Sequence, residues 1–154
     1  MRWQMASPLG GLLLEEEEGA LVRLRIGGAP AAPPAGAAPT PLLREAAAQL
    51  EAYFARDRRG FDLPLAPAGG GPFERQVWQA LTEIPYGATE TYGSLARRIG
   101  GVARAVGQAC GANPLPILVP CHRVLAAGGS GGFSAPGGVD TKYRLLALEG
   151  AALL

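Results

Sequence analysis

The chain contains a single histidine, and it directly follows one of only two cysteines. Cys121, His122 and Arg123 bring together a thiol, a side chain that titrates near neutral pH and a permanently charged guanidinium. A thiol becomes a strong nucleophile as the thiolate, which a nearby base or cation favours. The sequence therefore predicts nucleophilic chemistry at Cys121.

The neighbouring histidine is expected to act on the thiol indirectly. Adjacent side chains do not face each other on a helix or on a strand, so a direct hydrogen bond from Cys121 to His122 is not expected. One ordered water between them is enough for proton transfer. The imidazole then needs a partner that fixes its tautomer, and Glu149 is one of few carboxylates near the C-terminus. The pair alone fits equally well a buried structural cysteine beside a surface histidine.

Prolines precede the nucleophile at positions 114, 116 and 120. Each proline fixes its own φ angle and favours an extended conformation for the residue before it. The run from Asn113 to Val124 is therefore expected to form a rigid, partly buried strand or turn that presents Cys121 in one orientation.

The sequence Pro120-Cys121-His122-Arg123 resembles the active-site signature of the O6-alkylguanine-DNA alkyltransferases, also called methylated-DNA–protein-cysteine methyltransferases. The resemblance covers nearly the whole chain, in blocks that keep the family's order on both sides of the nucleophile. These blocks are residues 7–10, 18–21, 50–54, 73–78, 85–87, 91–96, 104–107 and 145–150.

This resemblance implies a suicide methyltransferase that repairs DNA directly. The alkyl group of O6-alkylguanine, and also of O4-alkylthymine, would pass from double-stranded DNA to Cys121 in a single turnover. The target atom lies inside a duplex, so the damaged base must first be flipped out. The resemblance implies contact through the minor groove, a cytoplasmic monomer, no cofactor and no metal.

The resemblance also implies roles for individual residues around the thiol. The catalytic residues would be Cys121, His122, Glu149, Asn113 and Tyr92. Glu149 would orient the imidazole, which draws the thiol proton through water. Asn113 would brace the turn that carries the nucleophile, and Tyr92 would donate its hydroxyl to the flipped guanine.

A second implied set binds the DNA and the base. Arg104 would take the place of the flipped base in the stack. The Val124 carbonyl would accept from the exocyclic amine, and the loop at Ser134 would support the leaving O6. Ala105 and Gly107 would lie on the recognition helix.

Two neighbours of the thiol, Pro120 and Arg123, are expected to be structural. Arg123 is expected to form an ion pair between the two domains.

Composition excludes several classes of protein. There is no charged-then-apolar leader and no long apolar run, so secretion and membrane spanning are not expected. Two cysteines form no disulfide framework, and one histidine with two cysteines cannot complete a zinc site without carboxylates. A free thiol suits a reducing cytoplasm.

The charge is nearly balanced, at a formal net of +1. Residues 72–154 carry seven basic and five acidic residues, a net of +2, whereas residues 1–71 carry seven and eight, a net of −1. Such a small excess predicts few phosphate contacts and a shallow dependence of DNA binding on salt.

The first 70 residues are expected to form an α/β scaffold domain, a small ribonuclease H-like antiparallel sheet with a helix. Alternating apolar residues predict strands over 11–16 and 20–26, joined at Glu18-Gly19 with a solvated acidic end. Residues 41–58 predict a helix with an apolar stripe, and residues 61–65 a short strand. The stripe consists of Leu43, Ala47, Leu50, Tyr53 and Phe54.

Residues 71–154 are expected to form a mostly α, winged-helix-like domain that binds DNA and accepts the alkyl group. A helix starts at Pro72 and presents Trp78 to the core. A second helix, capped by Thr91, ends at Gly100, and a third runs from near Val102 to about Cys110. This pair predicts a helix-turn-helix. Its turn looks about two residues shorter than is usual in the resembled family.

The third helix is unusually rich in glycine and alanine, which gives it little side-chain bulk. Glycine weakens a helix, so either core packing or close approach to a DNA backbone must favour it. Cys110 on this helix is either a small apolar filler or a second reactive thiol.

Three other functions remain compatible with parts of the pattern. A non-enzymatic relative would bind the lesion without transfer, but such relatives replace the nucleophile that is present here. A helix-turn-helix regulator would show sequence preference and keep its function in Cys121→Ala. A cysteine hydrolase would need turnover and an oxyanion hole, and the adjacent Cys-His geometry speaks against it.

Overall fold

A computed structural model describes residues 1–27, 38–127 and 138–151 of the chain. It divides into two compact units, Met1–Ala68 and Gly69–Leu154, each of which is described by itself. Ser134, expected to support the leaving group, lies outside the described residues.

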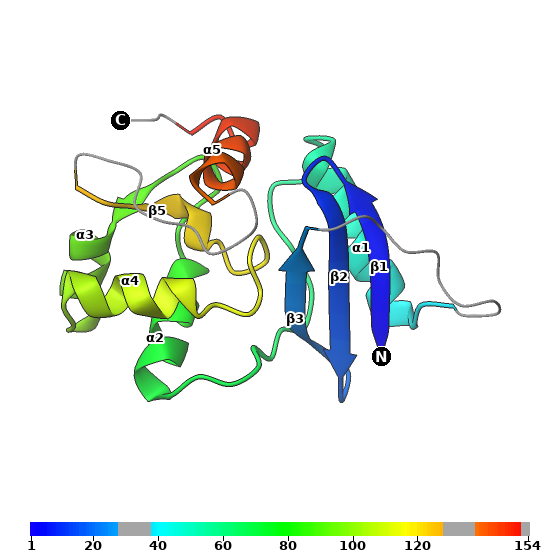
Figure 1. Ribbon diagram of the computed structural model, residues 1–154, viewed down its shortest axis with the longest axis horizontal. Coiled ribbons are helices and arrows are strands. Elements are labelled where there is room, and N and C mark those ends of the chain that lie inside the picture. The colour runs from blue at the N-terminus through cyan, green and yellow to red at the C-terminus, as the bar shows by residue number, and fades with distance from the viewer. Residues whose placement is uncertain (28–37, 128–137, 152–154) are drawn as a thin grey trace. The chain divides into compact units, whose positions relative to one another are not determined.

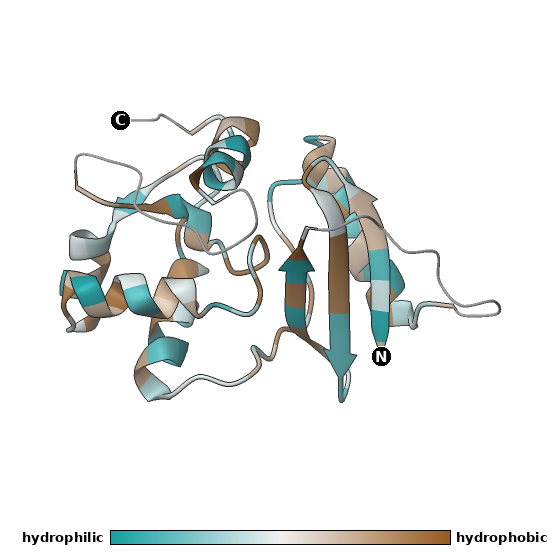
Figure 2. Ribbon diagram, in the orientation of Figure 1, coloured by the Kyte–Doolittle hydropathy of each residue, from teal (hydrophilic) through white to brown (hydrophobic). Residues whose placement is uncertain are grey.

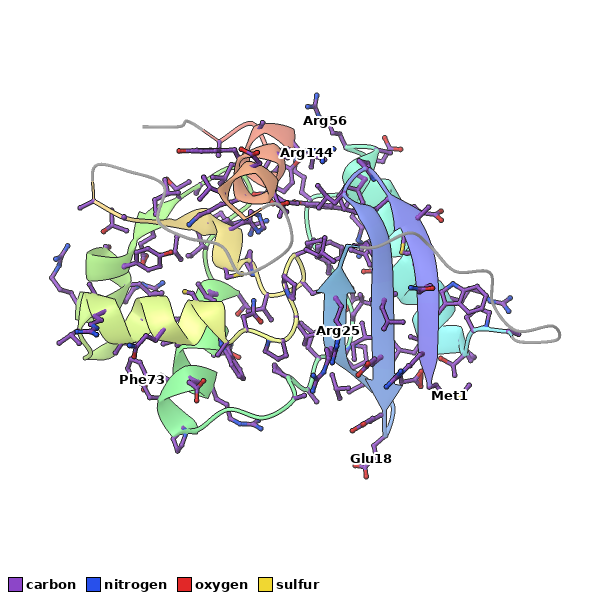
Figure 3. The ribbon with its side chains drawn as sticks, in the orientation of Figure 1. Met1, Glu18, Arg25, Arg56, Phe73 and Arg144 are labelled. Carbon is purple, nitrogen blue, oxygen red and sulfur yellow. The ribbon has the colours of Figure 1, made fainter. Side chains whose placement is uncertain are left out.

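The first unit is a three-stranded antiparallel sheet with one helix. Strands β1 (Arg2–Ser7), β2 (Gly10–Glu17) and β3 (Ala20–Ile26) pair in chain order, and α1 (Pro41–Phe54) lies behind β1 and β2 in Figure 1. The predicted hairpin of β2 and β3 is confirmed, whereas β1 was not predicted because its polar sequence alternates weakly. Glu18 and Gly19, both with positive φ, form the tight hairpin turn, and Figure 3 shows Glu18 at its tip.

Helix α1 differs from its prediction in length and face. The Thr40 side chain accepts from the Leu43 amide and caps the start, but the helix ends at Phe54 rather than at residue 58. Arg56 has a φ of 63°, in the left-handed region that ends many helices. The buried face includes Ala46 instead of Ala47.

The expected strand over 61–65 is reduced to one isolated bridge between Leu65 and Leu21.

The second unit is mostly helical. Helices α2 (Pro72–Leu81), α3 (Tyr92–Ile99) and α4 (Ala103–Gly111) precede a 3₁₀ turn at Cys121–Arg123, and α5 (Val139–Leu148) follows it. Two short strands, β4 (Glu90–Thr91) and β5 (Val124–Leu125), pair in parallel beside them. Figure 1 shows the 3₁₀ turn and β5 beneath α5. The pairing ties the segment after the nucleophile to the start of α3.

Helices α3 and α4 form the predicted helix-turn-helix. The Thr91 hydroxyl accepts from the Ser94 amide at the start of α3, and Gly100 ends the helix in the left-handed conformation. The next residue, Gly101, lies so close to Phe73 that a Cβ there would be 2.9 Å from the ring (Phe73 is labelled in Figure 3). The Trp78 indole donates to the Ala109 carbonyl at 2.8 Å and fixes α4 on α2.

The predicted fold class, an antiparallel α/β unit followed by a mostly α unit with a helix-turn-helix, is confirmed. Figure 2 shows the apolar middle of β2 passing into a hydrophilic end, where three glutamates lead into the hairpin turn. No helix in the described ranges is long and apolar enough to cross a membrane.

Candidate active site

A tight turn presents the nucleophile. The Cys121 amide donates to the Val119 carbonyl at 2.8 Å across Pro120, whose φ of −79° and ψ of 66° are those of an inverse γ-turn. Proline suits the centre of this turn because its ring fixes φ near the required value. The cysteine that follows is buried, with 6% of its surface exposed.

Asn113 bonds two backbone groups of the segment that leads to the thiol. Its side-chain amide donates to the Val119 carbonyl at 2.8 Å, and its oxygen accepts from the Leu115 amide at 3.0 Å. Between these anchors, buried Ile117 has a φ of 73°, which a β-branched residue rarely adopts. The anchored segment therefore holds a strained backbone at Ile117, before the turn that presents Cys121.

His122 and Arg123 both bind the carboxylate of Glu149. His122 Nε2 lies 2.7 Å from Glu149 Oε2, and Arg123 donates Nε to Oε1 at 2.8 Å and Nη2 to Oε2 at 3.0 Å. Arg123 also donates Nη1 to the Ile84 carbonyl at 2.7 Å. These partners all belong to the second unit. The expected ion pair of Arg123 is present, but its expected place between the domains is wrong.

This carboxylate fixes the orientation of the imidazole. With Nε2 donating to Glu149, the neutral ring keeps its lone pair on Nδ1. Nδ1 is buried and has no hydrogen-bond partner in the described part of the chain. Burial lowers the pKa of His122, against the opposing effect of Glu149, so the ring is neutral at neutral pH. The neutral imidazole of His122 can therefore accept a proton at Nδ1.

The Cys121 thiol is protonated in the resting protein. Burial raises its pKa, while the Asn113 side chain, the Lys142 charge and a backbone hydrogen bond lower it less strongly. A nucleophile in this setting needs a base to remove its proton.

Lys142 is a residue of this site that the sequence reasoning missed. Its side chain is fully buried, and Nζ lies 3.4 Å from the Tyr92 hydroxyl and 5.5 Å from the centre of that ring. Burial lowers its pKa, while Cys121 and Cys110 raise it, so the ammonium is close to both thiols. One signal was available, because Lys142 is the only lysine in a chain whose other basic residues are arginines.

Tyr92 joins the cluster from the first residue of α3 and is half-buried. Burial raises the pKa of Tyr92 to about 12, with smaller contributions from Cys110 and Cys121. The phenol therefore keeps its proton at neutral pH and can donate a hydrogen bond.

Cys110 lies near the same thiol but is not activated. Burial raises its pKa to about 12, and the Cys121 charge adds to this effect. A thiol with so high a pKa is a poor nucleophile, which favours the apolar filler over a second reactive thiol.

The other described residues expected to bind DNA or the base lie on α4 and in β5. Arg104 is exposed at the start of α4, with Ala105 and Gly107 following on the same helix. A Cβ at Gly107 would meet no described residue within 4 Å, so packing within the described part of the unit does not require glycine there. Val124 is buried in β5, opposite Glu90.

The chain matches two family descriptions that together span most of its length. Residues 3–67 match "6-O-methylguanine DNA methyltransferase, ribonuclease-like domain", and residues 72–151 match "6-O-methylguanine DNA methyltransferase, DNA binding domain".

Similar proteins carry related names. A methylated-DNA–protein-cysteine methyltransferase of Methanosarcina acetivorans is 52% identical over 111 residues, which cover 70% of this chain and 69% of that protein. The constitutive one of Bacillus subtilis is 40% identical over 151 residues, covering 93% and 91% of the two chains.

Solved structures are similar over nearly the whole chain. The crystal structure of Mycobacterium tuberculosis O6-methylguanine methyltransferase has a TM-score of 0.83 and 40% identity, covering 97% of this chain and 92% of that one. The structure of Mycobacterium tuberculosis OGT in complex with DNA has a TM-score of 0.81 and 41% identity, covering 96% and 91%.

Proposed function

The chain belongs to the 6-O-methylguanine DNA methyltransferase family, a family of transferases that act in DNA repair by direct alkyl transfer, and on that premise we propose Cys121 as its alkyl acceptor. The resemblance seen in the sequence is thereby confirmed. The substrate is double-stranded DNA that carries O6-alkylguanine or O4-alkylthymine. Residues 71–154 would bind this DNA and accept the alkyl group, while residues 1–70 act as a scaffold.

The observation that carries the assignment of Cys121 is the buried Nδ1 of His122, which has no partner among the residues that the structure describes. Glu149 holds the other ring nitrogen at 2.7 Å, and Arg123 holds Glu149, so the imidazole cannot turn without breaking buried hydrogen bonds. One water between Nδ1 and the thiol would carry the proton from Cys121 to His122. The histidine thus supplies the base that the high pKa of the thiol demands.

The reaction is a displacement at the alkyl carbon. The Cys121 thiolate forms a new S–C bond as the bond between that carbon and O6 breaks, and the electron pair stays on the guanine. The thiol proton goes to His122, and the leaving guanine is stabilised by hydrogen bonds. The product is a thioether with no low-energy route back to the thiolate. Each protein molecule therefore reacts once.

Tyr92 is the hydrogen-bond donor for the leaving guanine. Its phenol keeps its proton because its pKa is about 12, and the Lys142 ammonium donates to the phenol oxygen. A phenol that accepts from a cation is a stronger donor to a third group. Lys142 therefore acts as a positioning residue through Tyr92.

The DNA would be engaged from its minor groove by a cytoplasmic monomer. Exposed Arg104 would enter the stack in place of the flipped base, while Ala105 and Gly107 allow α4 to approach the backbone. The Val124 carbonyl and the loop at Ser134 would contact the flipped base. The open space around Gly107 supports this orientation of α4.

Intact-protein mass spectrometry tests this function. The protein is mixed with a duplex that holds one O6-methylguanine, in parallel with Cys121→Ala and Cys110→Ala. We expect one added methyl group, mapped to Cys121, in the wild type and in Cys110→Ala, and none in Cys121→Ala. Tight binding of the lesion without a change in mass would instead support a lesion-binding protein that transfers nothing.

A further inference from the structure

Two adjacent arginines on α3 differ in whether their charges are compensated. Arg98 donates Nη1 to Glu83 at 3.0 Å and Nη2 to Glu90 at 3.1 Å. Arg97 is exposed and has no hydrogen bond or ion pair with any residue in the described ranges. The free positive charge of α3 is therefore at Arg97.

The Arg97 side chain returns along α3 towards the active site. Helical side chains point towards the N-terminus of their helix, and the Nη1 of Arg97 reaches Gly93, 3.5 Å from the place where a Cβ would be. Gly93 is the second residue of α3 and follows Tyr92. Because Gly93 has no side chain, the guanidinium lies over the first turn of the helix.

That position is electrostatically unusual for a cation. The first turn of a helix carries a partial positive charge, so a guanidinium above it is disfavoured unless an anion is nearby. No carboxylate in the described residues pairs with Arg97 there, whereas two pair with Arg98. An external anion would be attracted by both the guanidinium and the helix.

We propose that Arg97 binds a phosphate of the DNA backbone beside the flipped nucleotide. This proposal rests on the proposed function, in which Tyr92 contacts that nucleotide. The first helix of a helix-turn-helix crosses the DNA backbone, and α3 is that helix here. A guanidinium can bind one phosphate through two parallel hydrogen bonds. Arg97 adds affinity for the strand and takes no part in the chemical step.

The test measures the salt dependence of binding to an unmodified duplex by fluorescence anisotropy. Arg97→Gln should lower the slope of log K against log salt by about 1 and weaken binding at 0.1 M salt roughly eightfold. Arg97→Lys, which keeps the charge, should restore most of the slope. Arg98→Gln is the matched control, and it should change the slope little because its charge is already neutralised.

Transfer from the free base O6-methylguanine, which has no phosphate, separates this proposal from the function on which it rests. Arg97→Gln should react with the free base at the wild-type rate. An unchanged slope in Arg97→Gln, or equal losses in Arg97→Gln and Arg98→Gln, would overturn the phosphate contact. A wild-type protein that transfers nothing from base or duplex would overturn the proposed function instead.

Discussion

The ammonium of Lys142 is buried beside the phenol of Tyr92 and within electrostatic range of two thiols, where a charge is costly to keep. Burying an ion is unfavourable, and replacing a buried charge by an apolar side chain of similar size is often neutral or stabilising. Lys142 is costly to bury, and its Nζ lies 3.4 Å from the Tyr92 hydroxyl, the proposed hydrogen-bond donor. A role in the reaction therefore explains Lys142 better than a contribution to folding stability does.

Lys142→Met is therefore expected to slow methyl transfer by about tenfold or more without lowering the melting temperature. If Lys142 acts through Tyr92, the same substitution should cost much less in a Tyr92→Phe background. Single-turnover kinetics and thermal denaturation of the two single variants and the double variant measure both effects. Additive losses in rate would show that Lys142 acts independently of the phenol.

The two buried thiols predict how stability depends on pH above neutrality. The pKa of Cys110 is raised from 9.0 to about 12 in the folded protein, so the unfolded chain releases its proton first as the pH rises. The stability that Cys110 contributes is complete below pH 9 and is lost between about 9 and 12, at up to about 1.4 kcal/mol per pH unit.

Urea unfolding at pH 8 and pH 10 checks this dependence. The wild type should lose more stability between the two values than Cys110→Ala, in which the contributions of Cys121, Tyr92 and Lys142 are unchanged and that of Cys110 is removed. Equal losses would mean that the Cys110 thiol ionises as easily in the folded state as in the unfolded one.

At the scale of the elements, α4 combines a weak helix sequence with open space. A Cβ added at Gly107 or at Gly111 would meet nothing within 4 Å among the residues that the structure describes, so the packing of those residues requires neither glycine. Of the two explanations that the sequence left open, core packing does not account for either glycine. For Gly107, which lies in the same half of α4 as Arg104, we propose close approach to DNA.

Gly107→Ala should therefore stabilise the protein by up to about 1 kcal/mol while weakening its binding to a duplex. Gly111→Ala at the far end of α4 is the control, and it should leave DNA affinity close to the wild-type value. Thermal denaturation and anisotropy titrations measure the two effects. A Gly107→Ala variant that binds DNA as tightly as the wild type would place that face of α4 away from the duplex.

The sequence predicted best those elements whose signals are local. Thr91 and Gly100 mark both ends of α3 because a capping hydroxyl and a left-handed glycine act within one helical turn. The end of α1 was misplaced because Arg56, not a glycine, adopts the left-handed conformation there. Strand β1 was missed because its pairing with β2, rather than its own alternation, makes it a strand.

At the scale of the whole molecule, the site joins side chains far apart in the chain. Before the resemblance, Glu149 was only one of few candidate carboxylates near the C-terminus, because no local rule connects it to His122, 27 positions away. The resemblance singled it out. Lys142 was missed because its proximity to Tyr92, 50 positions away, exists only in the folded unit. The residues next to Cys121 in the sequence identified it as the nucleophile. They did not reveal which distant side chains surround it in the folded unit.

The small net charge of the molecule predicts its behaviour on DNA. With a formal charge of +1, and with Arg98 and Arg123 already paired to carboxylates, few cations remain to replace counterions. Affinity for an unmodified duplex should fall less than about a thousandfold between 50 and 200 mM salt. A steeper loss in anisotropy titrations would reveal phosphate contacts that the charge distribution does not suggest.

The burial of Lys142 also affects how the folded protein can be modified. It is the only lysine in the sequence, so the folded surface offers no side-chain amine to acylating reagents or to enzymes that conjugate tags to lysine. Lysine acylation would therefore report the opening of the second unit, with a rate set by that opening. The alkylated protein, which cannot react again, would expose Lys142 to enzymes that attach tags to lysine only after it has begun to unfold.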